Sequence, residues 1–214
     1  KKAQITVPIH IEPGNRQHQG RGREAGCHGY GYLSCGLDGW DICSKLRDVC
    51  KGTGDDSAGY GPGRPQINRL PYDVAQAGAD IIYIHPESEL IPSATLELIQ
   101  LQGKKTGLIL NPCTTLESVK DMLPITDYVM IMAVNPGFAG REFMPYTRQK
   151  FIELNRYREE HGLAYHLLLD GGATREVISD LYHNCGVEGF VLGKQELFFQ
   201  KEDYAACIDR IRAI

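Results

Sequence analysis

One acidic residue in the sequence stands where catalytic chemistry is expected. Asp170 directly follows the apolar run Tyr165–Leu169 and is followed by Gly171, Gly172 and, two residues later, Thr174. An acid at the C-terminal tip of a buried strand is typical of the catalytic residues of α/β barrels. Glycines that lead into a helix N-terminus favour a phosphate group, because the free N–H groups there attract anions. The alternative is that Asp170 only caps the helix.

Two further turns that contain glycine follow apolar runs. Backbone N–H groups can approach an anion closely at such glycines. Glycines after the last two strands of an eight-stranded barrel form a recurrent phosphate site. Together with the turn after Asp170, these segments predict a site for a phosphorylated substrate. Their residues are Gly137, Phe138, Ala139 and Gly140 in the first turn, and Gly193 and Lys194 in the second.

The elements that would position these residues recur through residues 73–214. Short and nearly continuous apolar runs alternate with amphipathic helical stretches, which is typical of parallel strands covered by helices. This rhythm predicts an α/β fold, a (β/α)8 TIM barrel, as a single domain over residues 1–214. The predicted strands are Ile81–Ile84, Gly107–Leu110, Tyr128–Val134, Tyr165–Leu169 and Gly189–Leu192.

Signals for helix starts lie between these runs. Ser93 can begin one helix, Thr114 and Glu117 have the spacing of a capping box, and Pro145 and Thr174 can each open a further helix. We expect the apolar residues of each stretch to face the core. These residues are Leu96, Leu98, Ile99, Val119, Met122, Leu123, Phe151, Ile152, Leu154, Tyr157, Val177, Ile178, Leu181, Tyr204, Ile208 and Ile211.

Residues 1–72 do not share this pattern. Thirteen of the 24 glycines lie between Gly14 and Gly63, and four of the seven cysteines lie between Cys27 and Cys50. Residues 15–63 have neither strand alternation nor a helical stripe, and their composition is that of loops, which favours a loop-rich or disordered extension. The cysteine spacing matches no common zinc site, and without a CxxC pair it indicates free thiols. Yet a barrel needs three more βα units, and this segment has the length to hold them.

Composition narrows the possible partners. A net charge of −4 argues against a broad nucleic-acid surface, which needs a basic excess. No apolar run approaches the roughly 18 residues of a membrane span, and the first residues lack a secretory signal pattern. We therefore expect a cytoplasmic protein with no nucleic-acid partner and no membrane partner.

The motifs of the turns resemble those of the ribulose-phosphate 3-epimerase family. The resemblance runs from about Asp73 to Phe198, and the His-Pro-Glu and Phe-Ala-Gly variants are most similar to its allulose-6-phosphate 3-epimerase branch. The motifs that carry it are, in chain order, Ile84-His85-Pro86-Glu87, Leu108-Ile109-Leu110-Asn111-Pro112, Asn135-Pro136-Gly137-Phe138-Ala139-Gly140, Asp170-Gly171-Gly172 and Gly193.

The resemblance implies an epimerase that inverts C3 of ribulose 5-phosphate or allulose 6-phosphate, in a homo-oligomer. It implies one divalent metal, usually zinc, on two histidines and two aspartates, which neutralises a planar enediolate. Two aspartates act as general acid and base on opposite faces of the sugar. Asp170 matches one of them and is also a metal ligand, and Met132 matches a methionine beside the enediolate. The positions that match sugar-phosphate contacts are Gly137, Phe138, Ala139, Gly140, Gly171, Gly172, Gly193 and Lys194.

The other half of the family's site has no match. Leu33 and Cys35 stand where ligands are expected, although an Asp-Gly pair follows at Asp38. Two explanations are open. The segment has diverged and leaves a sugar-phosphate barrel without its metal, which is non-catalytic or catalyses a different reaction, or residues from about 8 to 69 are encoded in a shifted reading frame. We favour the shifted frame, because it preserves length while replacing the residue pattern. Of the remaining histidines, His85 fits best as a packed residue, and His166 lies too deep along its strand to share a metal with Asp170.

Overall fold

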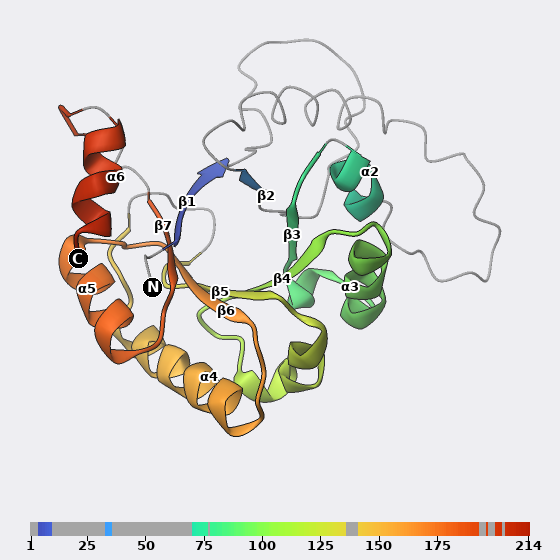
Figure 1. The fold of residues 1–214 in the computed structure, drawn as a ribbon. Helices are drawn as coiled ribbons and strands as arrows, with labels where there is room; N and C mark the ends of the chain where they lie inside the picture. Colours follow the sequence, from blue (N-terminus) through green and yellow to red (C-terminus); the bar gives the residue numbers. More distant parts are fainter. Residues whose placement is uncertain are drawn as a thin grey trace, which may run out of the picture.

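The strands form a closed barrel (Figure 1). The computed structural model describes residues 4–9, 33–35, 70–76, 78–135, 141–192, 196, 200–202 and 204–214. Within these residues, the strands follow one another around the barrel in chain order. They are β1 (Gln4–Ile9), β2 (Leu33–Cys35), β3 (Ile81–Ile84), β4 (Lys105–Leu110), β5 (Tyr128–Met132), β6 (His166–Asp170) and β7 (Gly189–Val191). The five predicted strands are confirmed as β3 to β7, with small shifts at their ends.

The strands from β3 to β7 pair in parallel, and β7 also pairs in parallel with β1. In contrast, β2 runs antiparallel to both β1 and β3. Among the described residues, this part of the barrel therefore differs from the all-parallel arrangement that we expected. A parallel neighbour requires a long crossover, usually helical, and the sequence between β1 and β2 has no amphipathic pattern. The strand β2 lies within residues 15–63, a segment whose sequence shows no sustained strand alternation.

Side chains fill the inside of the barrel. Successive residues of a strand point to opposite faces, so every second residue of β4, β5 and β6 lies inside. The Tyr83 ring packs against β4 so closely that a Cβ atom at Gly107 would lie 2.2 Å from Tyr83 Cδ1. Gly107 is therefore required for the interior to close around this ring. The interior cluster consists of Tyr83, Ile109, Met130, Met132, Val134, Leu168 and Val191.

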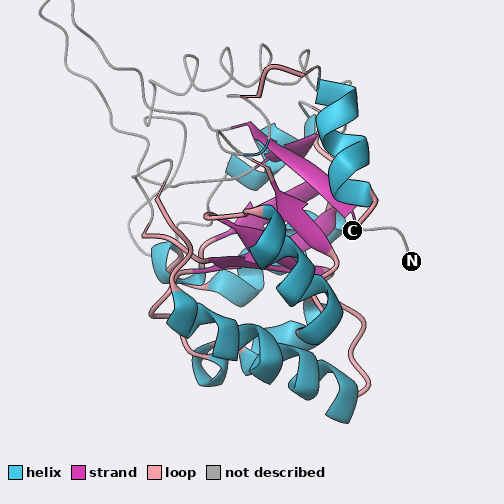
Figure 2. Ribbon diagram, turned by 90° about the vertical axis from the view of Figure 1, so that its left-hand side faces the viewer, coloured by secondary structure: helices cyan, strands magenta, loops and turns pink. Residues whose placement is uncertain are grey.

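Helices lie around the outside of the strands and cover a second, larger core (Figure 1, Figure 2). The helices are α2 (Leu70–Gln76), α3 (Pro92–Leu101), α4 (Arg148–Glu160), α5 (Arg175–Asn184) and α6 (Tyr204–Arg212). Among the described residues, no helix has the length and the hydropathy that a membrane crossing requires. The predicted core residues that are buried there are Leu96, Ile99, Val119, Leu123, Phe151, Leu154, Ile178, Leu181, Ile208 and Ile211.

Two of the predicted helix starts are confirmed. Thr174 is the N-cap of α5, and its Oγ1 accepts a hydrogen bond from the Val177 backbone N–H at 3.4 Å. Pro145 opens a short 3-10 helix, η4 (Pro145–Thr147), which continues directly into α4. Both signals act through local backbone geometry, so sequence alone could identify them.

The capping box predicted at Thr114 and Glu117 is wrong. The Thr114 hydroxyl donates instead to the Glu87 carboxylate, which follows β3. The next residues form two 3-10 helices, η2 (Leu116–Ser118) and η3 (Lys120–Ile125), instead of an α-helix. Pro124 inside η3 lacks an N–H group and disfavours a longer α-helix.

The start predicted at Ser93 is also shifted. Ile91 is the N-cap of α3, and Ser93 is the second residue of the helix. Pro92 occupies the first helical position, where its fixed φ angle favours the helix and its missing N–H costs nothing. The proline therefore sets this helix start in place of a serine cap.

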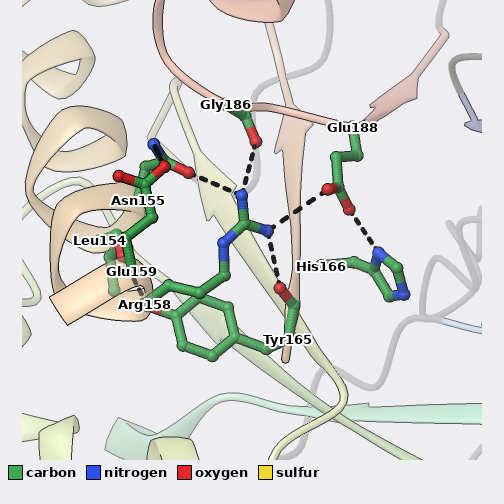
Figure 3. A network of polar contacts seen from close by, with 8 residues as sticks. All are labelled: Leu154, Asn155, Arg158, Glu159, Tyr165, His166, Gly186 and Glu188. Carbon is green, nitrogen blue, oxygen red and sulfur yellow. Dashed lines mark hydrogen bonds and ion pairs between the residues drawn. The ribbon is translucent and has the colours of Figure 1, made fainter. Parts of the chain in front are cut away.

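A polar network lies where β6 and β7 begin (Figure 3). Arg158, near the end of α4, donates to the Tyr165 carbonyl at 2.8 Å and lies 3.5 Å from Glu188 Oε1. Glu188 also pairs with His166, the first residue of β6. Because Asp170 is at the other end of the same strand, this network stabilises the end of the barrel away from the candidate site. His166 is thus placed away from Asp170, as predicted.

Candidate active site

Asp170 is the last residue of β6 and is partly buried. It lies in register with Met132 on β5 and with Val191 on β7. Leu168, two residues earlier, belongs to the interior cluster, so Asp170 shares the strand face that is turned into the barrel. The alternative in which Asp170 caps the following helix is wrong, because Thr174 is the N-cap of α5.

The two glycines after Asp170 have backbone conformations that favour glycine. Gly171 has a φ angle of +96° and Gly172 has a φ angle of +64°. A Cβ atom at Gly171 would lie 2.5 Å from Val134 Cγ2, and one at Gly172 would lie 2.3 Å from the Phe143 backbone N. The turn after β6 therefore approaches the chain that follows β5 very closely. Val134 and Phe143 lie on either side of the predicted turn at residues 137–140, which is itself outside the described residues.

The N-terminus of α5 is less open to an anion than the sequence indicated. The Thr174 hydroxyl already accepts the Val177 N–H. The Glu176 carboxylate accepts a hydrogen bond from its own backbone N–H and another from Thr174, and these bonds lower the pKa of Glu176. A phosphate near this turn would therefore depend mainly on the amides of Gly171 and Gly172.

His85 lies just beyond β3 and is buried, with 6% of its surface exposed. Its Nδ1 atom is 3.9 Å from Glu87 Oε2. Burial lowers the pKa of His85, while Glu87 and a backbone hydrogen bond at Ile109 act in the opposite direction. This burial supports the packed role that the sequence favoured for His85.

The loop after β4 is held by a lysine that the sequence reasoning did not single out. Lys150 Nζ donates to the carbonyl oxygens of Asn111 and Pro112, both at 2.9 Å, and to that of Thr114. Burial lowers the pKa of Lys150. Asn111, directly after β4, has a buried side-chain Oδ1 with no hydrogen-bond partner among the described residues. The sequence signal for this loop was the Asn-Pro pair at the end of a strand.

Of the remaining predicted site residues, one belongs to the described part of the chain and six do not. Met132 is 3% exposed inside the barrel, beside Asp170 in the register of the strands. Gly137, Phe138, Ala139, Gly140, Gly193 and Lys194 lie outside the described residues.

The described residues do not by themselves form a metal site. They contain no group of three or more histidine, cysteine, aspartate or glutamate side chains that could hold an ion. Asp170 is the one predicted ligand among them, and the segment in which the family has its other ligands falls mainly outside the described ranges.

The fold and the site define an α/β barrel protein with an acid and a double-glycine turn at the C-terminal ends of its strands. Residues 66–198 match the model of the ribulose-phosphate 3 epimerase family. The chain belongs to this family.

Individual relatives show the extent of the similarity. The chain is 37% identical over 147 residues to ribulose-phosphate 3-epimerase of Escherichia coli K12, covering 69% of this chain and 64% of that protein. It is 36% identical over 146 residues to the enzyme of the same name from Synechocystis, covering 65% and 60%. Among solved structures, a mutant tryptophan synthase alpha-subunit from Pyrococcus furiosus superposes with a TM-score of 0.48 and 19% identity, covering 68% and 57%. The chain thus spans less than two thirds of the length of the curated relatives.

Proposed function

We propose that this protein inverts the configuration at C3 of a ketose phosphate, with ribulose 5-phosphate as the first candidate and allulose 6-phosphate as the second. The single observation that supports this most is the position of Asp170. It ends β6 on the interior face of the barrel and leads directly into a turn that favours glycine at two positions. Family membership and the names of the curated relatives support the same reaction.

The proposed chemistry assigns one proton transfer to Asp170. Its carboxylate removes the C3 proton, which the adjacent C2 carbonyl acidifies, or returns a proton to the same face in the reverse direction. The electron pair of the broken C–H bond passes to the C2 oxygen and gives an enediolate. Inversion needs a second acid on the opposite face of this plane. None of the described residues is assigned to this second role.

The substrate is oriented by its phosphate. We assign the phosphate to the amides of Gly171 and Gly172, together with Gly137, Phe138, Ala139, Gly140, Gly193 and Lys194. Met132 supplies an apolar wall beside Asp170, since the two residues are neighbours in the β5–β6 register. An apolar wall excludes water and strengthens the electrostatic interactions of the carboxylate. In this proposal, residues 1–214 form one barrel domain.

The cofactor, partner and location proposals follow the family. A divalent ion, zinc in the first instance, would neutralise the charge of the enediolate when bound, with Asp170 as its one candidate ligand among the described residues. We further propose a cytoplasmic homo-oligomer. Residues 8–69 are proposed to be encoded in a shifted frame, which the start of the family match at residue 66 supports. An uninterrupted frame in the coding DNA would contradict this.

Exchange of the C3 proton with solvent tests the function. Ribulose 5-phosphate is incubated in D₂O with the protein, and loss of the C3–H signal is followed by NMR. Asp170→Asn should slow exchange by roughly 10²–10⁴-fold, the usual contribution of a general acid–base group. Asp209→Asn is the control, because Asp209 is an exposed carboxylate on α6 that pairs only weakly with Arg212 at 3.7 Å. Equal exchange rates in the Asp170→Asn variant and the unmodified protein would overturn the proposal, and binding without exchange in the unmodified protein would leave a sugar-phosphate binder.

A further inference from the structure

Asn111 occupies a position in the barrel that the proposed chemistry does not yet use. It is the first residue after β4, and Ile109, two residues earlier, lies in the interior cluster. Leu110 is in register with Ile131, and continuing this register by one residue past the end of β4 places Asn111 beside Met132. Met132 is in turn in register with Asp170. The side chains of Asn111, Met132 and Asp170 therefore form one row across the interior face.

The backbone of Asn111 is held firmly. Its carbonyl oxygen accepts hydrogen bonds from Lys150 Nζ at 2.9 Å and from the Thr114 N–H at 3.0 Å. Pro112 follows it and restricts the conformation of Asn111 to extended forms. The position of the Asn111 backbone, from which the side chain extends, is therefore set before any ligand binds.

The side-chain oxygen of Asn111 requires a donor. Oδ1 is buried and has no hydrogen-bond partner among the described residues. A buried acceptor without a partner costs about 1–3 kcal/mol. A carbonyl oxygen can accept a hydrogen bond only, so neither a phosphate oxygen nor a ketone oxygen can satisfy it. A sugar hydroxyl can.

The row of Asn111, Met132 and Asp170 also indicates which hydroxyl of the substrate donates to Asn111 Oδ1. Neighbouring strands lie about 4.8 Å apart, so Asn111 and Asp170 are separated by roughly 10 Å across β5. This inference rests on the proposed function, which assigns the phosphate to the turns after β5, β6 and β7 and C3 to Asp170. The substrate end opposite the phosphate then extends toward β4. In a 2-ketose phosphate, that end carries the C1 hydroxyl.

We propose that Asn111 is a specificity residue whose Oδ1 accepts a hydrogen bond from the C1 hydroxyl of the ketose phosphate. Lys150 acts as a positioning residue for it, because its ammonium group holds the carbonyl oxygens of the loop that carries Asn111. The site then distinguishes a substrate with a C1 hydroxyl from an analogue with a methyl group at C1. Such discrimination arises because the analogue leaves the buried acceptor without a partner.

A matched pair of ligands tests this contact. Xylulose 5-phosphate and 1-deoxyxylulose 5-phosphate differ only in the C1 hydroxyl, and their dissociation constants are measured by titration calorimetry. The unmodified protein should bind xylulose 5-phosphate roughly 5–160-fold more tightly, which corresponds to the cost of about 1–3 kcal/mol for a buried acceptor without a partner. Asn111→Leu should abolish this preference and should not weaken binding of the deoxy analogue. Asn111→Asp keeps an acceptor oxygen and should retain part of the preference.

Two outcomes would overturn the role of Asn111, and a third would identify failure of the epimerase proposal alone. Equal affinity of the unmodified protein for both ligands would overturn the proposal. An equal loss of affinity for both ligands in Asn111→Leu would also overturn it, because the residue would then only support the loop. Failure of the epimerase proposal is recognised separately, as absence of C3–H exchange in D₂O while the ligand preference persists.

Discussion

Gly172→Ala separates two physical reasons for a glycine in the turn after β6. The first is backbone conformation, because Gly172 has a φ angle of +64°. A residue with a Cβ atom in the left-handed region costs about 1–2 kcal/mol. The second is contact, because the new Cβ atom would lie 2.3 Å from the Phe143 backbone N and 2.5 Å from its Cα. Backbone atoms cannot move aside as the end of a flexible side chain can, so this overpacking should cost about 1–3 kcal/mol more.

Gly162→Ala is the matched control for this variant. Gly162 has a φ angle of +62°, and a Cβ atom there would meet nothing within 4 Å. It should lose only the conformational part, about 1–2 kcal/mol. The free energies of unfolding of both variants are measured by urea denaturation. The expected difference between them is about 1–3 kcal/mol, with Gly172→Ala the less stable.

The comparison between Gly172→Ala and Gly162→Ala also tests the geometry of the candidate site. If the two variants lose the same stability, the turn after β6 does not approach the chain after β5 as closely as the structure has it. The proposed phosphate site, which uses the turns after β5 and β6 together, would then lose this support. If only Gly172→Ala is further destabilised, its affinity for inorganic phosphate should fall as well, since the turn must shift.

Two further predictions concern the helices and the barrel interior. Asp180 pairs with Arg148 at 2.6 Å, and this bond lowers the pKa of Asp180 to about 2 from 3.8. The pair therefore stabilises the fold above pH 4, and this contribution is lost as the pH falls toward 2. In Asp180→Asn, the free energy of unfolding should depend less steeply on pH between 4 and 2. The difference should be at most about 1 kcal/mol, because both groups are partly exposed. If the pH dependence of the free energy of unfolding is unchanged in Asp180→Asn, the pair with Arg148 is not its cause. Asp209→Asn is the control, because it removes a carboxylate elsewhere. Gly107→Ala should lower the free energy of unfolding by about 1–3 kcal/mol, because the new Cβ atom overpacks against Tyr83. Adding Tyr83→Leu should recover part of this loss in a double-mutant cycle. Strict additivity of the two changes would show that the residues do not interact.

Local patterns were sufficient for much of the architecture. The strand Ile81–Ile84 has the bounds that its apolar run predicted, and Thr174 caps α5 as its residue type indicated. Both signals are contained in a few consecutive residues. Asp170 could be singled out for the same reason, since a strand end, an acid and two glycines are adjacent in the chain.

Other features depend on residues that are distant in the sequence. Thr114 has the spacing of a capping box, yet its hydroxyl bonds to Glu87, which is 27 residues away. The antiparallel strand β2 has only three residues, too few for a recognisable alternation, so its pairing with β1 and β3 could not be predicted from its own pattern. In both cases a tertiary contact outweighed the local preference.

By itself, the sequence determined the fold class, most strand positions, the acid at the end of β6 and the glycines beside it. These properties follow from hydrophobic periodicity and from the conformational limits of single residues. Only the tertiary structure decided that Gly172 meets Phe143, that Lys150 holds the loop after β4, and that Asn111 lies in one row with Asp170. Each of these is set by the register of neighbouring strands and by packing between separate loops, which no short stretch of sequence encodes.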